Sequence, residues 1–175
     1  MKKMLMRDIF FALFFSLVLM GCDKQKLTHQ NIVTNYYNAF NASDFNSIKT
    51  YINDSITITE GDYVMSFNQS SFYEQFKWDS VFKPSYKIVE LKETNNQIDV
   101  TVAVNSLRFE FLKNNPLTCR HKISFDLNKI SKIEALECLE ADWNVWQRER
   151  DTLIAWTNKN HPELDGFILG EPLKG

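Results

Sequence analysis

The chain has 175 residues, of which 24% are charged and 44% hydrophobic, and its formal net charge is −2. Its lysines and arginines are scattered, which argues against a nucleic-acid partner, because phosphate binding needs clustered cations. The three histidines (His29, His121 and His161) and three cysteines show no metal-ligand spacing, so we expect no metal and no other cofactor.

The N-terminus has the pattern of an export signal. Lys2, Lys3 and Arg7 precede an apolar segment, residues 9–20, which is too short to span a bilayer comfortably. We therefore expect a cleaved signal rather than a transmembrane helix. The 154 residues that remain after residue 21 are enough for one domain with a sizeable core.

The end of the apolar segment, Leu19-Met20-Gly21-Cys22, resembles the lipobox of bacterial lipoproteins. In that pattern a small residue precedes the cleavage site and the cysteine thiol accepts a diacylglyceryl group. The resemblance implies a lipoprotein signal peptide over 1–21, lipidation at Cys22 and a tether over 22–28. Acyl chains would then hold the protein on a membrane of the bacterial cell envelope, inner or outer. The alternative is an ordinary signal peptide with an incidental cysteine.

Helical spacing of apolar residues dominates the next part of the chain. Turn-forming and capping residues divide it into short elements. The predicted elements are helices over 29–42 and 45–52, strands around 56–58 and 63–67, and a helix from Ser71 that ends before Pro84.

From Tyr86 onward the apolar period changes to two, which predicts antiparallel hairpins. Turns are expected at 95–96, at 114–116 and near 128–131. Between the first two turns we expect one long strand, bent by a bulge at Asn105-Ser106. The far half of that strand would present Phe109 and Phe111 on its apolar face.

The register of the last hairpin decides which side chains meet. Pairing Phe125 with Ile133 keeps apolar residues together, and it places His121 opposite Glu137 on the enclosed face. Such a pair could hold or polarise a ligand. The simpler alternative is a core histidine that is hydrogen-bonded to a carboxylate.

The same register separates the two remaining cysteines. It places Cys119 opposite Leu139 and turns Cys138 to the reverse face. Two cysteines in an exported protein suggest a disulfide, but this register predicts that the two thiols are not bonded to each other.

A long helix is predicted from Ala141 to Asn160. Trp143, Trp146 and Trp156 lie on and around its apolar side. We expect residues 141–175 to pack on the domain, with the tryptophans over the sheet or across its open end. An aromatic groove for a sugar or a peptide is the alternative.

The segment Tyr36-Tyr37-Asn38-Ala39-Phe40-Asn41-Ala42-Ser43-Asp44-Phe45 resembles the opening of the nuclear transport factor 2 superfamily, which includes SnoaL-like and ketosteroid isomerase-like proteins. Ile52-Asn53-Asp54-Ser55-Ile56 is similar to the segment that follows there. The resemblance covers residues 29–140. It implies an α+β fold in which a curled antiparallel sheet and N-terminal helices form a cone around a pocket, here with an extra C-terminal helix.

Members of this superfamily are enzymes, ligand binders or dimerisation modules, so a homodimer is one arrangement the resemblance allows. Tyr36 matches the helix-borne catalytic tyrosine of the isomerase branch. The base position, however, falls near Thr59, with Glu60 one residue away, and the position of the buried acid falls near Ile123, which cannot donate a hydrogen bond. Isomerase activity is therefore not expected.

We expect a membrane-anchored lipoprotein whose domain is a non-catalytic module for a small apolar ligand or a protein partner. Its predicted ligand-binding residues are Tyr36, Phe109, Phe111, His121, Phe125 and Glu137. One alternative is a pocket enzyme that transfers protons with His121, Glu137 and Tyr36. Another is a structural envelope protein in which Tyr36 is only a core aromatic.

Overall fold

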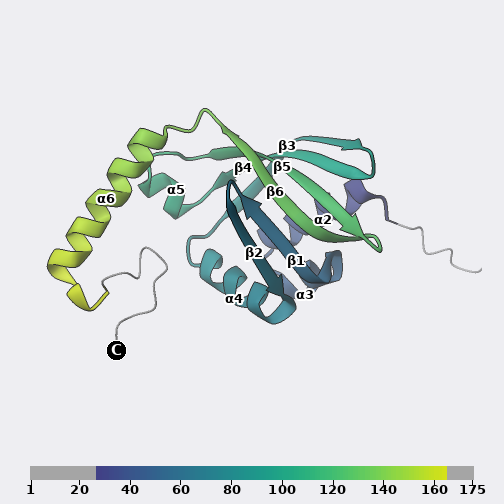
Figure 1. Ribbon diagram of the computed structural model, residues 1–175, viewed down its shortest axis with the longest axis horizontal. Helices are drawn as coiled ribbons and strands as arrows, with labels where there is room; N and C mark the ends of the chain where they lie inside the picture. Colours follow the sequence, from purple (N-terminus) through teal and green to yellow (C-terminus); the bar gives the residue numbers. More distant parts are fainter. Residues whose placement is uncertain (1–26, 165–175) are drawn as a thin grey trace, which may run out of the picture.

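A curled six-stranded sheet, with helices against one of its faces, forms the body of the protein (Figure 1). The computed structural model describes residues 27–164. Its elements are α2 (His29–Asn41), α3 (Phe45–Tyr51), β1 (Ile52–Glu60), β2 (Tyr63–Asn68), α4 (Gln69–Ser80), β3 (Ser85–Thr94), β4 (Gln97–Asn105), α5 (Leu107–Phe111), β5 (Leu117–Asp126), β6 (Lys129–Leu139), α6 (Trp143–Asn160) and a 3-10 turn, η1 (Pro162–Leu164). The expected signal peptide, Cys22, most of the tether and residues 165–175 lie outside the described residues.

Short polar side chains set where the helices begin. The Thr28 hydroxyl accepts a hydrogen bond from the first turn of α2, and the Asp44 carboxylate does the same for α3. Helix α4 begins two residues earlier than predicted, because Asn68 and Ser71 form a reciprocal capping box. Each cap satisfies a backbone N–H that the helix itself leaves without a partner.

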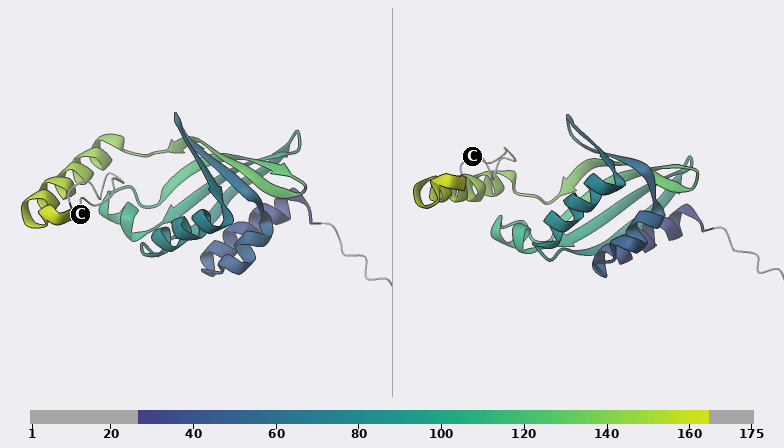
Figure 2. Two further views of the ribbon diagram at one scale, coloured as in Figure 1. Left: turned by 60° about the horizontal axis from the view of Figure 1, so that its bottom comes forward. Right: turned by 90° about the horizontal axis from the view of Figure 1, so that it is seen from below.

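The strands lie in the order β2-β1-β6-β5-β4-β3, and β2 and β3 are the two edges. All neighbours are antiparallel except β1 and β6, which run parallel from Ile52 and Ile130 to Glu60 and Ala135. The predicted α+β fold is confirmed, but the sheet is mixed rather than wholly antiparallel. Helices α2, α3 and α4 cover one face of the sheet, as Figure 2 shows.

The core lies between these helices and the sheet. Its most deeply buried side chains are apolar and come from α2, α3 and the four inner strands. They are Val33, Ile48, Ile52, Ile56, Ile98, Val100, Val102, Ile123 and Ile130. Burying one such side chain stabilises the fold by about 1.5–3 kcal/mol, so this layer holds the helices in register over the sheet.

The long bent strand predicted through Phe111 is wrong. Strand β4 ends at Asn105, and Ser106 begins the short helix α5 by accepting a hydrogen bond from the Phe109 N–H at 3.1 Å. The break at Asn105-Ser106 is thus a helix cap rather than a bulge. The helix turns Phe111 outward, where it is 43% exposed, and leaves Phe109 half-buried against the domain.

The β5–β6 hairpin turns at Leu127-Asn128, where both residues have positive φ. Two register shifts follow, one between Ser124 and Phe125 and one between Arg120 and His121. Because the turn has only two residues, Phe125 lies opposite Ile130 rather than Ile133. The bulge at Ser131 then puts Ile130 and Ile133, three residues apart, in the same core, so a prediction that assumes unbroken alternation gives the wrong partners.

The second shift brings the two cysteines together. Cys119 lies directly opposite Cys138, and the two sulfurs form a disulfide. The prediction of two unbonded thiols is therefore wrong. The bulge at Leu136 moves the end of β6 by one position, which returns Cys138 to the face of Cys119.

Helix α6 projects away from the domain, which it meets at its first turn (Figures 1 and 2). The Asn114 side chain donates to the Asp142 carbonyl at 3.2 Å and accepts from the Asp142 N–H at 2.7 Å. The Trp146 ring packs on Phe109, whereas Trp143 and Trp156 are 52% and 54% exposed. For the described residues, the expected packing of the helix on the domain is thus limited to its start.

Candidate functional site

An inner cavity of about 380 Å³ lies between the helices and the sheet. Residues of α2, α4, α5 and of the five strands β1 to β5 form its wall. They are Tyr36, Tyr37, Phe40, Ile58, Glu60, Met65, Phe67, Phe72, Gln75, Asp79, Phe82, Pro84, Tyr86, Val104, Ser106, Arg108, Phe109 and His121. Most of this wall is apolar and aromatic, as in sites that bind small organic molecules.

Aromatic rings packed edge to face make one side of the inner cavity. Phe40 contacts Tyr36 with 5.0 Å between ring centroids and Tyr86 with 5.3 Å. Phe72 and Phe76 extend the cluster from α4. Because such arrangements are geometrically specific, they hold the wall in a defined shape.

Tyr36 carries a hydroxyl that borders the cavity. The residue is 4% exposed, and no hydrogen bond joins its hydroxyl to another residue between 27 and 164, a range in which Thr59 Oγ1 is the only fully buried polar side-chain atom without a partner. Burial, helped by the nearby Tyr37, Tyr86 and Asp79 groups, raises its pKa well above the usual value. The phenol therefore stays protonated, and a ligand acceptor in the cavity would accept its hydrogen bond.

His121 meets Tyr37 rather than Glu137. The Tyr37 hydroxyl and His121 Nδ1 are 3.5 Å apart, and the tautomer of the ring decides which of the two donates. Burial lowers the pKa of His121 to about 4 and raises that of Tyr37. Both groups are consequently neutral at pH 7.

The predicted acid/base pair of His121 and Glu137 does not form. The turn and the bulge at Ser131 place His121 opposite Ala135, and the bulge at Leu136 places Glu137 opposite Arg120. The Glu137 carboxylate accepts from Arg120 at 2.6 Å, and both side chains are about half exposed. A bridge of this kind is solvated and contributes little to stability.

Asp79 is a site residue that sequence analysis missed. It lies in the last turn of α4, half-buried in the cavity wall, and accepts a hydrogen bond from Gln75 at 3.2 Å. Burial raises the pKa of its carboxyl group, although the Gln75 hydrogen bond and the Arg108 charge act in the opposite direction. The helical spacing of Phe72, Phe76 and Asp79 could have indicated its position, because residues three and four apart share a face.

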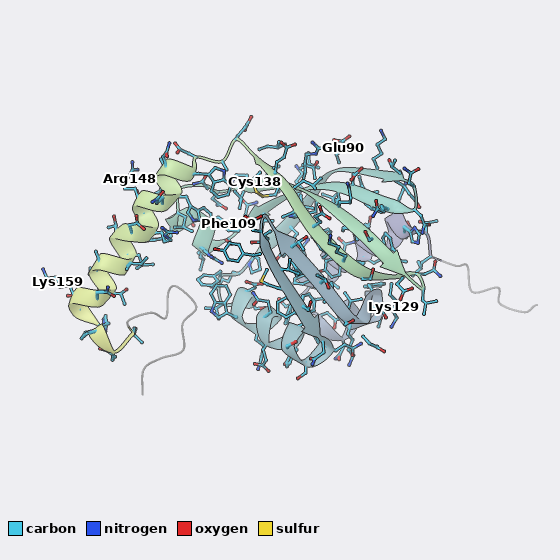
Figure 3. The ribbon with its side chains drawn as sticks, viewed as in Figure 1. Glu90, Phe109, Lys129, Cys138, Arg148 and Lys159 are labelled. Carbon is cyan, nitrogen blue, oxygen red and sulfur yellow. A yellow bond between two sulfur atoms is a disulfide. The ribbon has the colours of Figure 1, made fainter. Side chains whose placement is uncertain are left out.

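A second, outer chamber of about 640 Å³ lies beside the inner cavity. Its wall is built by α5, the ends of β5 and β6, and the start of α6 (Phe109 and Cys138 are labelled in Figure 3). It is lined by Glu60, Gly61, Val104, Arg108, Phe109, Leu117, Cys119, His121, Ala135, Leu136, Glu137, Cys138, Trp143 and Trp146. The disulfide is part of this wall, so it joins the two strands that form it.

The six predicted ligand-binding residues are not all brought together. Tyr36, Phe109 and His121 border the inner cavity, and Glu137 borders only the outer chamber. Phe111 points to solvent, and Phe125 stacks on His29 with 4.0 Å between ring centroids, away from both cavities. These two positions follow from helix α5 and from the shifted hairpin register.

The isomerase positions are not filled by catalytic groups. Ile123 is fully buried in the core, and the Thr59 hydroxyl is buried without a partner among the described residues. Glu60, one residue further, borders both cavities. Within residues 27–164, no group of histidine, cysteine or acidic residues could hold a metal ion, and no helix is long and apolar enough to cross a membrane.

No protein-family model and no curated protein matches the sequence. Several solved structures match the fold of the chain. An NTF2-like protein of unknown function from Cytophaga hutchinsonii aligns over 65% of this chain and 92% of its own, with a TM-score of 0.53 and 13% identity. The chain has the nuclear transport factor 2-like fold.

Two further structures with this shape carry names that suggest activities. A putative polyketide cyclase from Sinorhizobium meliloti aligns over 60% of this chain and 93% of its own, with a TM-score of 0.52 and 13% identity. A putative ketosteroid isomerase from Kribbella flavida aligns over 65% and 82%, with a TM-score of 0.51 and 9% identity. At such identities the likeness shows the fold and not the activity.

Proposed function

We propose that this protein is a lipid-anchored binding protein whose NTF2-like domain takes up a small, uncharged and largely apolar molecule. The observation that carries this proposal is the Tyr36 hydroxyl, which borders an aromatic-walled cavity of about 380 Å³ and makes no hydrogen bond with another residue of the described chain. A ligand oxygen, carbonyl or hydroxyl, would accept its hydrogen bond.

The deep end of the cavity favours an uncharged ligand. His121 is neutral because its pKa is about 4, and the hydroxyls of Tyr36 and Tyr37 stay protonated. A charged ligand group placed beside these three side chains would lose its water without gaining an opposite charge from them, which is unfavourable. The ionisable wall residues Glu60, Asp79 and Arg108 also border the cavity. Apolar contacts with Phe40 and Phe72 would supply most of the affinity.

The anchoring part of the proposal rests on the sequence. Residues 9–22 have the pattern of a lipoprotein signal that ends at Cys22, and a short polar tether separates Cys22 from α2. Acylation at Cys22 would keep the binding domain close to the membrane surface of the cell envelope.

A second candidate is a pocket enzyme that transfers a proton, and Asp79 favours it. Its carboxyl has a raised pKa and lies near the protonated Tyr36. A carboxylate and a phenol can together remove and return a proton. Glu137 has no part in this candidate, because Arg120 holds it.

Calorimetric titration with 1-octanol tests the binding proposal. We expect saturable binding to the parent and an affinity about five- to tenfold lower for Tyr36→Phe, since one hydrogen bond contributes about 1 kcal/mol. The matched control is Tyr63→Phe, which makes the same change at a residue that is 78% exposed. Absence of binding to the parent, or equal affinity for Tyr36→Phe, would contradict the proposal. Tyr36→Phe should unfold at the parental temperature, because it breaks no hydrogen bond among the described residues.

A further inference from the structure

We infer that the ligand is an elongated neutral amphiphile, whose apolar body lies in the inner cavity and whose polyhydroxylated, sugar-like head lies in the outer chamber. This inference rests on the proposed function and adds to it the class of the ligand. Four observations carry it: the wall residues that the two spaces share, the Tyr36 hydroxyl on the inner cavity, the aromatic faces of the outer chamber and its mixed charge.

The two spaces adjoin each other through shared walls. Glu60, Val104, Arg108, Phe109 and His121 border both of them. A molecule that fills only the inner cavity would leave the outer chamber open beside it. An elongated ligand would contact both spaces and pass the side chains of α5.

The inner cavity is the place for the apolar end. Its wall is mainly aromatic and aliphatic, and Tyr36, Tyr37 and His121 in this wall are uncharged, whereas Glu60, Asp79 and Arg108 are its other ionisable side chains. An alkyl or ring system buried there gains about 25 cal/mol for each Å² of apolar surface removed from water.

The outer chamber presents aromatic faces of a kind that a sugar ring covers well. Trp146 contacts Trp143 with 5.5 Å between ring centroids and Phe109 with 5.8 Å. The aromatic face is electron-rich and attracts the weakly positive C–H groups on one side of a pyranose ring. Trp143 is 52% exposed, so its ring is accessible to such a ligand.

Charges of both signs lie in the outer chamber. Glu60 and Arg108 border it and form no ion pair with residues 27–164, although Arg108 lies 5.2 Å from the Trp78 ring. A hydroxyl both donates and accepts, so several hydroxyls on one head can satisfy a carboxylate and a guanidinium together. An anionic head would meet Arg108 but also Glu60, and a cationic head would meet Glu60 but also Arg108, so each attraction is opposed by a repulsion. The pair therefore selects a neutral polar head.

Trp143 and Trp146, which α6 contributes to the chamber, lie beyond residues 29–140. The hydrogen bonds between Asn114 and Asp142 hold the start of α6 beside the chamber, and the disulfide joins the two strands of its wall. Helix α6 thus adds two aromatic side chains to a chamber whose other lining residues belong to the domain.

Four probes with the same eight-carbon chain test this inference: octyl β-D-glucopyranoside, 1-octanol, octanoate and octyltrimethylammonium. Each is titrated into the protein below its micellar concentration. We expect octyl glucoside to bind at least tenfold more tightly than 1-octanol, and both charged probes to bind more weakly than 1-octanol. If octanoate or octyltrimethylammonium binds more tightly than octyl glucoside, the inference that the head group is neutral is wrong.

The variant Trp143→Ala tests whether the head group of the ligand binds in the outer chamber. We expect it to lower the affinity for octyl glucoside about tenfold and to leave that for 1-octanol unchanged. The matched control is Trp156→Ala, since Trp156 is similarly exposed at the far end of the same helix and borders neither cavity.

The outcomes separate this inference from the proposed function. If 1-octanol binds but octyl glucoside binds no more tightly, or if Trp143→Ala affects both probes equally, the inference fails and the proposed function stands. If neither probe binds the parent, both fail.

Discussion

The Tyr37 hydroxyl lies 3.5 Å from Nδ1 of His121, and this contact joins α2 to β5 across the inner cavity. The partner of the buried imidazole is therefore a neutral phenol rather than a carboxylate. With a carboxylate partner the pKa of His121 would rise, whereas in this setting burial lowers it to about 4. As a result, His121 lowers the stability of the fold as the pH falls, whereas with a carboxylate partner it would lower it as the pH rises.

His121 should make the fold less stable in mild acid. In the unfolded chain the imidazole is protonated below about pH 6.5, whereas in the folded protein it stays neutral down to about pH 4. The unfolded state therefore binds more protons between these values, and stability is lost as the pH falls through this window. We expect the free energy of unfolding to fall by up to about 3 kcal/mol more for the parent than for His121→Gln between pH 7 and pH 4.

Urea unfolding at a series of pH values measures this difference. The control is His161→Gln, at an exposed histidine beyond α6, which should follow the parent curve. Parallel curves for His121→Gln and the parent would show that His121 titrates normally in the folded protein.

Glu137→Gln should lower the free energy of unfolding only slightly. It removes one partner of an exposed ion pair with Arg120, and such pairs contribute about 0.2–1 kcal/mol. We expect a loss of unfolding free energy within that range, a similar loss for Arg120→Gln, and an unchanged His121 titration measured by NMR. A change in the pKa of His121 would mean that Glu137 interacts with the imidazole after all.

Removing the disulfide should destabilise the protein substantially. Cys119 and Cys138 close a loop with a sequence separation of 19, and a crosslink over a loop of that size contributes about 3 kcal/mol. We expect the double variant Cys119→Ala/Cys138→Ala to lose about that amount in urea unfolding. Parent protein in reductant serves as the control and should show a comparable loss.

Alkylation provides an independent check on that bond. In the denatured, unreduced parent neither Cys119 nor Cys138 should take up label until reductant is added. Labelling of both thiols without reductant would contradict the disulfide and support the register in which the two sulfurs lie on opposite faces.

Cys22→Ser should release the protein from membranes or leave an unprocessed precursor, because the thiol that accepts the lipid is missing. Cell fractionation and gel migration measure the effect. The control is the double variant Cys119→Ala/Cys138→Ala, which keeps Cys22 and should remain in the membrane fraction. A Cys22→Ser variant that fractionates and migrates like the parent would rule out the lipoprotein proposal.

Local patterns in the sequence were sufficient for most elements of the fold. The apolar stripe from Ile32 to Phe40 predicts a helix that the structure has at His29–Asn41, and the alternating apolar residues predict strands β3 to β6. The helix and strand periods arise within a few residues, so they can be recognised without the rest of the chain. The break at Ser106 shows the limit, because a helix cap and a bulge both interrupt the same alternation.

The residues of the site come together through tertiary structure. The turn at Leu127-Asn128 and the bulge at Ser131 make Ala135, rather than Glu137, the partner of His121, and the bulge at Leu136 then brings Cys138 onto Cys119. Asp79 and Tyr36 border one cavity although 43 positions separate them in the chain. Periodicity specifies which face of an element is apolar, so most elements follow from the sequence, whereas the pairing of distant elements, and with it the site, depends on how their faces pack.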